Sequence, residues 1–156
     1  MNDFLAIDPG TKQSAWIFYS PNCGAALDMA IESNERVIER IKGYRLPIAC
    51  EMIDSYGMPV GREVFETCLW VGRFIQVASE HRLIYRKDVK MHLCNSVRAK
   101  DSNIRQALID LYPATGGGKT PQIGTKAKPG PLYGFKSHLW AALAVAHTHS
   151  HNLGGQ

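Results

Sequence analysis

The sequence predicts an α/β fold in which short buried strands alternate with amphipathic helices. Residues 4–7 are four consecutive apolar residues followed by Asp8-Pro9-Gly10, a pattern typical of a strand in the middle of a sheet. Residues 46–50 form a second apolar run, which ends at Glu51. The longest predicted helix carries one apolar stripe at helical spacing, formed by Val64, Cys68, Val71, Ile75 and Ala78.

The other elements follow in order along the chain. A strand at 14–19 comes directly after a tight connection, so we expect it to form an antiparallel hairpin with the first strand. Apolar spacing and turn residues predict short strands near Ala25 and at 83–85, and helices at 28–42, 62–81, 87–94, 101–111 and 137–149. Asp101 or Ser102 is the expected N-cap of the fourth helix. His147, His149 and His151 are expected in a frayed, exposed tail.

The length and composition fit one globular domain over residues 1–156. The chain is 45% hydrophobic and 21% charged, which argues against a disordered or fibrous protein. Residues 113–134 are rich in Gly, Pro and Lys and predict a mobile loop. No apolar run is long enough to span a membrane, so we expect a cytoplasmic protein without membrane contact. The four cysteines have no CxxC spacing and predict neither a zinc site nor a disulfide framework.

Charge is distributed unevenly along the chain. Residues 1–81 contain 7 Lys and Arg against 11 Asp and Glu, a net charge of 7 − 11 = −4. Residues 82–156 contain 11 against 3, a net charge of 11 − 3 = +8. A basic half of this kind favours a polyanionic partner, and nucleic acid is the natural one. The alternative is a solvated basic face that binds nothing.

Two carboxylates stand where predicted buried strands end. Asp8 ends the first strand and Glu51 ends the strand at 46–50, so both should reach the same edge of the sheet. Mg²⁺ prefers carboxylate oxygens and water, and phosphodiester hydrolysis requires cations that activate water and stabilise the leaving oxygen. The pattern therefore indicates metal-dependent phosphoryl transfer. Asp54 could add an oxygen, although a turn-forming role is the more natural interpretation of this residue.

A nucleotide cofactor is not predicted. Gly118-Lys119-Thr120 has the end of a phosphate-loop pattern, but Pro113 stands where the first glycine would be and no strand precedes it.

Several stretches resemble the RuvC Holliday-junction resolvases of the RNase H-like superfamily, in the same order over nearly the whole chain. They are residues 7–10, the strand ending in Glu51, Ala99-Lys100-Asp101 and residues 140–146. Residues 55–61 and 131–134 resemble the compact phage and prophage branch of that family. The resemblance implies a mixed five-stranded sheet, with an antiparallel N-terminal hairpin followed by parallel strands, flanked by helices. It also implies a homodimer through the helix at 62–81.

The resemblance further implies a metal site. Asp8 and Glu51 match the first two metal carboxylates of the family, and His138 matches the third position, where some members carry His. These three residues are the predicted catalytic and metal-binding set, with Mg²⁺ as the cofactor and Mn²⁺ as a substitute. Ala141 stands where the family has its fourth carboxylate. Asp54 or Asp101 could replace that group, or the enzyme could work with three protein ligands and more water.

DNA contacts are expected from the basic half, the hairpin turn and an aromatic residue. The family places lysines near the scissile phosphate, which implies such a role for Lys100 and Lys119, and an aromatic that stacks on unpaired bases, here Tyr56 or Phe65. The full set of predicted DNA-binding residues is Lys12, Tyr56, Phe65, Lys87, Arg98, Lys100, Lys119 and Lys136.

The function that follows is a crossover junction endodeoxyribonuclease, a Mg²⁺-dependent enzyme of DNA recombination and repair that cuts branched DNA in the cytosol of a bacterial host, encoded by the host, a phage or a prophage. Two alternatives stay open. Because Ala141 replaces a family carboxylate, the chain could bind branched DNA without cutting it. It could also be an RNA nuclease of the same superfamily.

Overall fold

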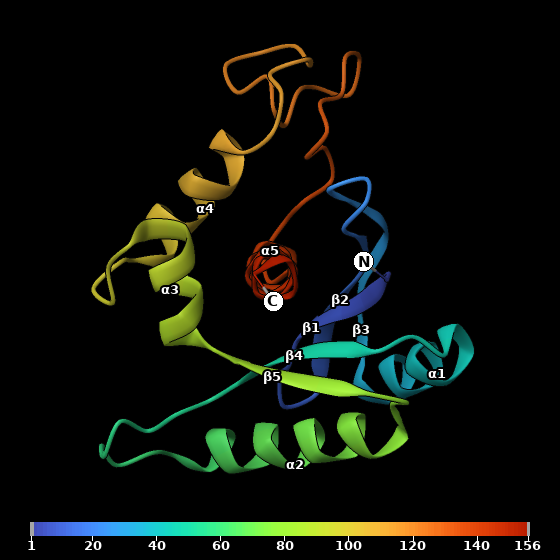
Figure 1. Cartoon of the computed structure of the whole chain (residues 1–156), viewed down its shortest axis with the longest axis vertical. Coiled ribbons are helices and arrows are strands. Elements are labelled where there is room, and N and C mark those ends of the chain that lie inside the picture. Colours follow the sequence, from blue (N-terminus) through green and yellow to red (C-terminus); the bar gives the residue numbers. More distant parts are fainter. Residues whose placement is uncertain (1, 156) are drawn as a thin grey trace.

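A computed structural model describes residues 2–155 and contains a five-stranded mixed sheet of order β3-β2-β1-β4-β5 (Figure 1). The first three strands are antiparallel, and β4 and β5 run parallel to the central strand β1. This arrangement confirms the predicted α/β fold with its N-terminal hairpin. The strand bounds are β1 Phe4–Asp8, β2 Gln13–Ser20, β3 Ala25–Ser33, β4 Ile48–Met52 and β5 His81–Tyr85.

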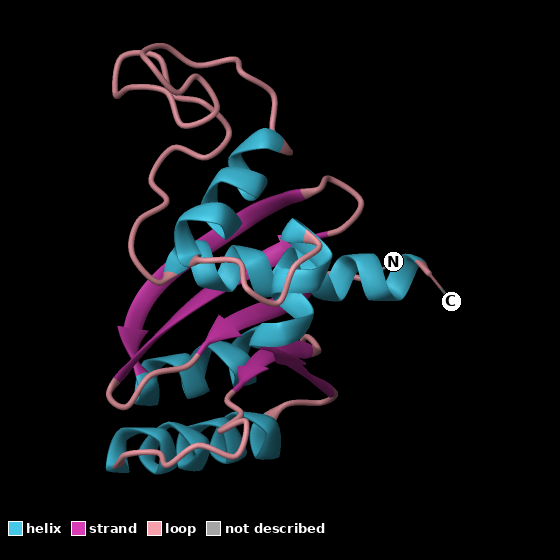
Figure 2. Cartoon of the chain, turned by 90° about the vertical axis from the view of Figure 1, so that its left-hand side faces the viewer, coloured by secondary structure: helices cyan, strands magenta, loops and turns pink. Residues whose placement is uncertain are grey.

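Helices cover both faces of the sheet (Figures 1 and 2). Helices α1 (Asn34–Tyr44) and α2 (Arg62–Val77) pack on one face. The other face carries α5 (Leu139–Gly154), which lies against β1 and β2 and is in turn flanked by α3 (Arg86–Cys94) and α4 (Asp101–Asp110).

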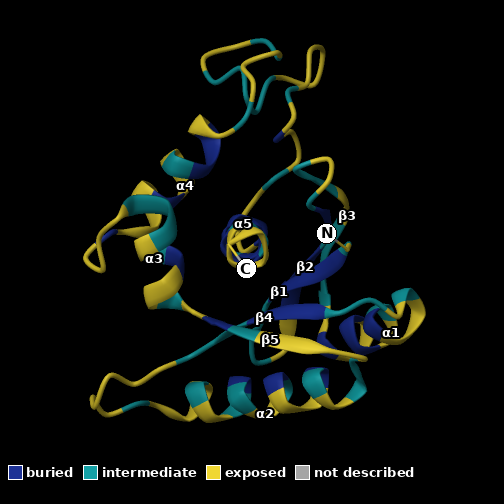
Figure 3. Ribbon diagram, in the orientation of Figure 1, coloured by how far each residue is buried: buried dark blue, intermediate teal, exposed yellow. Residues whose placement is uncertain are grey.

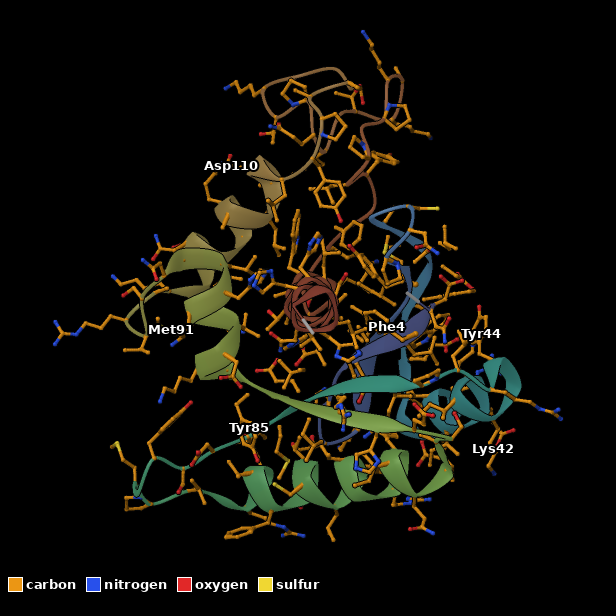
Figure 4. All side chains as sticks on the ribbon, viewed as in Figure 1. Phe4, Lys42, Tyr44, Tyr85, Met91 and Asp110 are labelled. Atoms are coloured by element: carbon orange, nitrogen blue, oxygen red, sulfur yellow. The ribbon has the colours of Figure 1, made fainter. Side chains whose placement is uncertain are left out.

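Helix α5 forms the centre of the larger core. Its residues 142–146 are Ala, Leu, Ala, Val and Ala, and all five are completely buried (Figure 3). Small side chains let the helix approach the sheet closely, while Leu143 fills the remaining space. Side chains occupy the region between α5, the sheet and α3 (Figure 4). The start of α5 is thereby fixed relative to β1.

One predicted element is wrong. Residues 28–33 belong to β3 and not to a helix beginning at Asp28. They pair with β2 in antiparallel register, for example Ile31 with Ala15, so sheet hydrogen bonding overrides the local helical pattern. The true start signal is Ser33, whose side chain accepts a hydrogen bond from the Arg36 N–H and caps α1.

Helix ends also differ from the sequence-based expectations. Helix α2 ends at Val77 rather than at residue 81, because the Glu80 carbonyl accepts from the Ile48 N–H and so joins the chain to the sheet. The N-cap of α4 is Lys100, whose N–H donates to the Asn103 side chain. The expected C-terminal tail is instead helical, since α5 continues to Gly154 and His149 is buried on it.

The segment between α4 and α5 contains no named helix or strand, and its backbone hydrogen bonds close it on itself. Gly124 and Gly130 lie so close to neighbouring backbone that a Cβ on either would lie 2.3 Å from a backbone atom.

Within residues 2–155, no helix combines the length and apolar character needed to cross a bilayer.

Candidate metal centre and nucleic-acid interface

Two acidic side chains leave the sheet from adjacent parallel strands. Asp8 is the last residue of β1, and Glu51 lies near the end of β4. The register pairs Ile7 with Cys50, so the next residue on each strand is one of these acids. Their side chains are only 13% and 14% exposed. The two positions predicted from strand-end acids therefore come together in space.

The turn after Asp8 is held by a buried polar network. The Ser14 hydroxyl donates to Asn34 Oδ1 at 2.6 Å, and Asn34 Nδ2 donates to the Gly10 carbonyl at 2.9 Å. A Cβ on Gly10 would lie 2.3 Å from the Gln13 carbonyl oxygen, so only glycine fits there. Sequence reasoning missed Asn34 and Ser14, which position the turn and with it Asp8.

Burial raises the pKa of both acids. Desolvation, helped by the neighbouring Asp8 charge, raises the pKa of Glu51 to about 7. Burial also raises the pKa of Asp8, against the opposing effect of His138 and Arg86. Two neighbouring carboxyl groups do not easily ionise together, so the charge of Asp8 contributes to the raised pKa of Glu51, while the positive charge of Arg86 opposes the shift at both acids.

His138 joins this pair from the far end of the chain. It is the N-cap of α5, and its Nδ1 lies 2.8 Å from Asp8 Oδ2. Ser137, directly before it, has a φ of 48°, a left-handed conformation that turns the chain into the helix. The His138 side chain is 73% exposed, so the ring contacts Asp8 and also meets solvent.

Arg86 is a fourth residue of the site, and sequence reasoning did not single it out. Its Nη1 lies 4.0 Å from Glu51 Oε1, and its Nη2 contacts Asp101 Oδ1. The strand-end argument could have found it, because β5 pairs in parallel with β4 and Arg86 directly follows β5. Asp101, proposed from the sequence as a replacement ligand, is therefore paired with Arg86.

The other candidate replacement ligand forms a turn. Asp54 Oδ1 accepts from the Tyr56 N–H at 2.9 Å, which is the turn-forming role considered for it. Ala141 lies one helical turn beyond His138 and offers no ligand atom. Within residues 2–155, no group of three or more His, Cys, Asp and Glu side chains is arranged so that it could hold a metal ion.

The residues present nevertheless fit a hard divalent cation. Two carboxyl groups in contact provide the oxygen ligands that Mg²⁺ and Mn²⁺ prefer, and an imidazole stands beside them. Their raised pKa values show that positive charge at this point would be favourable. Asp8 and Glu51 would hold such an ion, with His138 next to it.

The predicted DNA-binding residues are all exposed, and they lie on several elements. Lys12, in the hairpin turn, lines a cavity of about 320 Å³ together with Asp8 and His138. Lys136 comes two residues before His138, and Lys100 caps α4 next to Asp101. The remaining basic residues are Lys87 on α3, Arg98 in the α3–α4 connection and Lys119 in the long loop.

The two aromatic candidates lie between β4 and the middle of α2. Tyr56 is 60% exposed in the connection that follows Glu51, with a left-handed φ of 51°. Phe65 is 63% exposed on α2, one turn before Leu69, which is 70% exposed. Phe65 therefore belongs to an apolar surface of α2 as well as to the predicted set of stacking residues.

Comparison with known proteins identifies the fold. No family model matches the sequence. No curated protein matches it either. Among solved structures, RuvC of Thermus thermophilus is similar with a TM-score of 0.63 and 18% sequence identity, over 99% of this chain and 97% of that one. RuvC of the same organism in complex with a Holliday junction substrate gives a TM-score of 0.65 and 17% identity, over 98% and 95%.

The chain has the RuvC fold. The agreement extends over almost the full length of both chains, so the RuvC-like, RNase H-like fold expected from the sequence is confirmed. At this level of identity the likeness concerns the course of the backbone.

Proposed function

We propose that this chain is a metal-dependent, structure-selective endonuclease that cuts four-way junctions or other branched DNA. The observation that supports the proposal is that, in a RuvC fold, Asp8 lies next to both Glu51, on the adjacent parallel strand, and His138. The Thermus RuvC of the same fold binds a Holliday junction substrate. The net charge of +8 on residues 82–156, from 11 Lys and Arg against 3 Asp and Glu, supports a DNA partner.

In this proposal Asp8 and Glu51 hold Mg²⁺, for which Mn²⁺ can substitute. The ion would activate water and stabilise the charge that develops on the leaving oxygen. His138 Nδ1 and Asp8 Oδ2 lie within hydrogen-bond distance, and in this proposal the tautomer protonated at Nδ1 donates to the Asp8 carboxylate. The second ring nitrogen, Nε2, is then a base that can exchange a proton between the reacting groups and solvent.

The basic residues around the site would hold the DNA backbone. Lys12 shares a cavity with Asp8 and His138, which supports a contact between Lys12 and the scissile phosphate. Lys87, Arg98, Lys100, Lys119 and Lys136 would extend the contact, and Tyr56 would stack on an unpaired base.

A homodimer through α2 completes the proposal. Phe65 and Leu69 lie four residues apart on one exposed face of this helix, an arrangement suited to helix–helix contact. Two sites in a symmetric dimer could act on opposite strands of a four-way junction. The proposed setting is the bacterial cytoplasm, with a phage or prophage as a candidate source.

The test is cleavage of a synthetic four-way junction with Mg²⁺, compared with a linear duplex and a structured RNA. Asp8→Asn and Glu51→Gln should each lower cleavage by more than about 100-fold. Removing a residue that only supports a metal ligand costs up to about 100-fold, and these two residues would be ligands themselves. Glu39→Gln, on exposed α1, is the matched control and should cut normally. Equal cleavage by Asp8→Asn and the unmodified protein would contradict the proposed mechanism.

The same experiment tests a second function. Ala141 supplies no carboxylate beside the site, and this favours a protein that binds junctions without cutting them. Tight, structure-selective binding with no nicking in either Mg²⁺ or Mn²⁺ would establish that function instead. Preferred cleavage of the RNA would point to an RNA nuclease.

A further inference from the structure

The charges around Glu51 are not symmetric. Its carboxyl group interacts with that of Asp8, and it also lies near the Arg86 guanidinium, with Nη1 at 4.0 Å from Glu51 Oε1. Arg86 is held there by its contact with Asp101 and is 28% exposed. Its charge acts on Asp8 as well as on Glu51. A fixed cation of the protein thus already stands beside the two acids.

The cavity next to Arg86 offers few ligands for a second metal ion. A cavity of about 250 Å³ opens there between α4 and α5, and Arg86, Arg105, His138 and Ala141 are among its lining residues. Its one carboxylate, Asp101, is paired with Arg86, and the Arg105 guanidinium lies over the Trp140 ring at 4.7 Å. A second divalent ion would meet positive charge and no unpaired carboxylate.

We propose that the Arg86 guanidinium takes the place of a second metal ion, so that the site binds one divalent cation, which Asp8 and Glu51 would hold. In a two-metal phosphodiesterase site, cations stabilise both the attacking and the leaving oxygen. Here the bound ion would serve one of these oxygens, and N–H groups of Arg86 would donate hydrogen bonds to the phosphate beside the other. Guanidinium groups stabilise developing phosphoryl charge in this way.

The inference rests on the proposed nuclease function. Counting the metal ions bound at the site can contradict the inference and leave the proposed function intact. The experiment is a titration of the metal-free protein with Mn²⁺, in which electron paramagnetic resonance reports free Mn²⁺. Ions that belong to the site are those lost in Asp8→Asn. The expected count is one such ion per chain in the unmodified protein.

Three variants at the cavity test whether the charge of Arg86 is responsible. Arg86→Gln removes the charge, supplies an amide oxygen and frees Glu51 and Asp101, so the count should rise to two. Arg86→Lys keeps the charge and should keep the count at one. Arg105→Gln is the matched control, because it loses the same charge in the same cavity away from Glu51, and its count should also stay at one.

Each outcome bears on the one-ion inference, on the metal dependence of the proposed nuclease, or on both. Two site ions in the unmodified protein would overturn the inference and leave the nuclease proposal intact. A folded Arg86→Gln variant that still binds one ion would also overturn it. No Asp8-dependent Mn²⁺ at all would remove the metal dependence of the proposed function, and the inference with it. If Arg86→Gln does not fold, the counts in the unmodified protein and in Arg86→Lys still decide.

Discussion

His138 Nδ1 and Asp8 Oδ2 lie 2.8 Å apart although 130 positions of sequence separate the two residues. The contact joins the N-cap of α5 to the end of the central strand β1. The candidate centre is therefore a product of tertiary packing, because no local segment contains it.

The first prediction concerns His138. In His138→Asn the ring is lost, so cleavage of a junction should fall by about 10²-fold or more, the usual size of a general acid–base contribution. Junction affinity should change little. Single-turnover rates between pH 6 and 9 measure the effect. His151→Asn, on the exposed part of the same helix, is the control. Unchanged rates in His138→Asn would exclude a role for the ring in proton transfer.

The second prediction concerns Glu51 in the metal-free protein. Its pKa of about 7 in the folded state exceeds its ordinary value of 4.5, so between these values the folded protein keeps a proton that the unfolded chain has released. The contribution of Glu51 to the free energy of unfolding should therefore fall as pH rises from about 4.5 to 7, by of the order of 1–3 kcal/mol. Urea unfolding at several pH values measures it. Glu51→Gln should remove this part of the pH dependence.

The third prediction has the opposite sign and concerns His147. Burial lowers the pKa of this histidine from 6.5 to about 4, and its ring is hydrogen bonded to the Tyr112 hydroxyl. The unfolded chain binds a proton here in a range where the folded protein does not, so stability should fall as pH drops from 6.5 to 4. In His147→Gln the midpoint of unfolding should depend less on pH between 6.5 and 4. A variant as acid-sensitive as the unmodified protein would contradict the assignment.

The fourth prediction concerns Asn34, which is completely buried and joins Ser14 to Gly10. Asn34→Ala removes the partner of the buried Ser14 hydroxyl and of the half-buried Gly10 carbonyl, so the free energy of unfolding should fall by about 1–3 kcal/mol. Cleavage should also fall, since the turn after Asp8 loses its support. Urea unfolding and junction cleavage measure the two effects. Asn152→Ala, on the exposed end of α5, should change neither.

The fifth prediction concerns Lys100. If this residue contacts a DNA phosphate, Lys100→Ala should weaken junction binding and lower the slope of log affinity against log salt by about 1. Lys42→Ala is the control, because Lys42 lies on α1, which packs on the opposite face of the sheet from α4. Equal slopes in the two variants would exclude a phosphate contact at Lys100.

The ends of the predicted strands could indicate the centre of the site, because neighbouring parallel strands end at the same edge of the sheet whatever sequence lies between them. They predicted the meeting of Asp8 and Glu51, and the family resemblance added His138. Arg86 follows the end of β5 at the same edge of the sheet, but the sequence pattern concerned acids only, so it did not indicate this arginine. Strand β3 was missed because its pairing with β2 is a tertiary interaction that local spacing does not record.

The central position of α5 also determines when the proposed site can assemble during synthesis of the chain. A nascent polypeptide that has not yet emerged beyond residue 137 has both strand-end acids but neither His138 nor the helix that covers β1 and β2. The larger core cannot close until α5 docks on β1 and β2. In the proposed function, a chain synthesised only as far as residue 137 would therefore lack an assembled site and could not nick nearby nucleic acid.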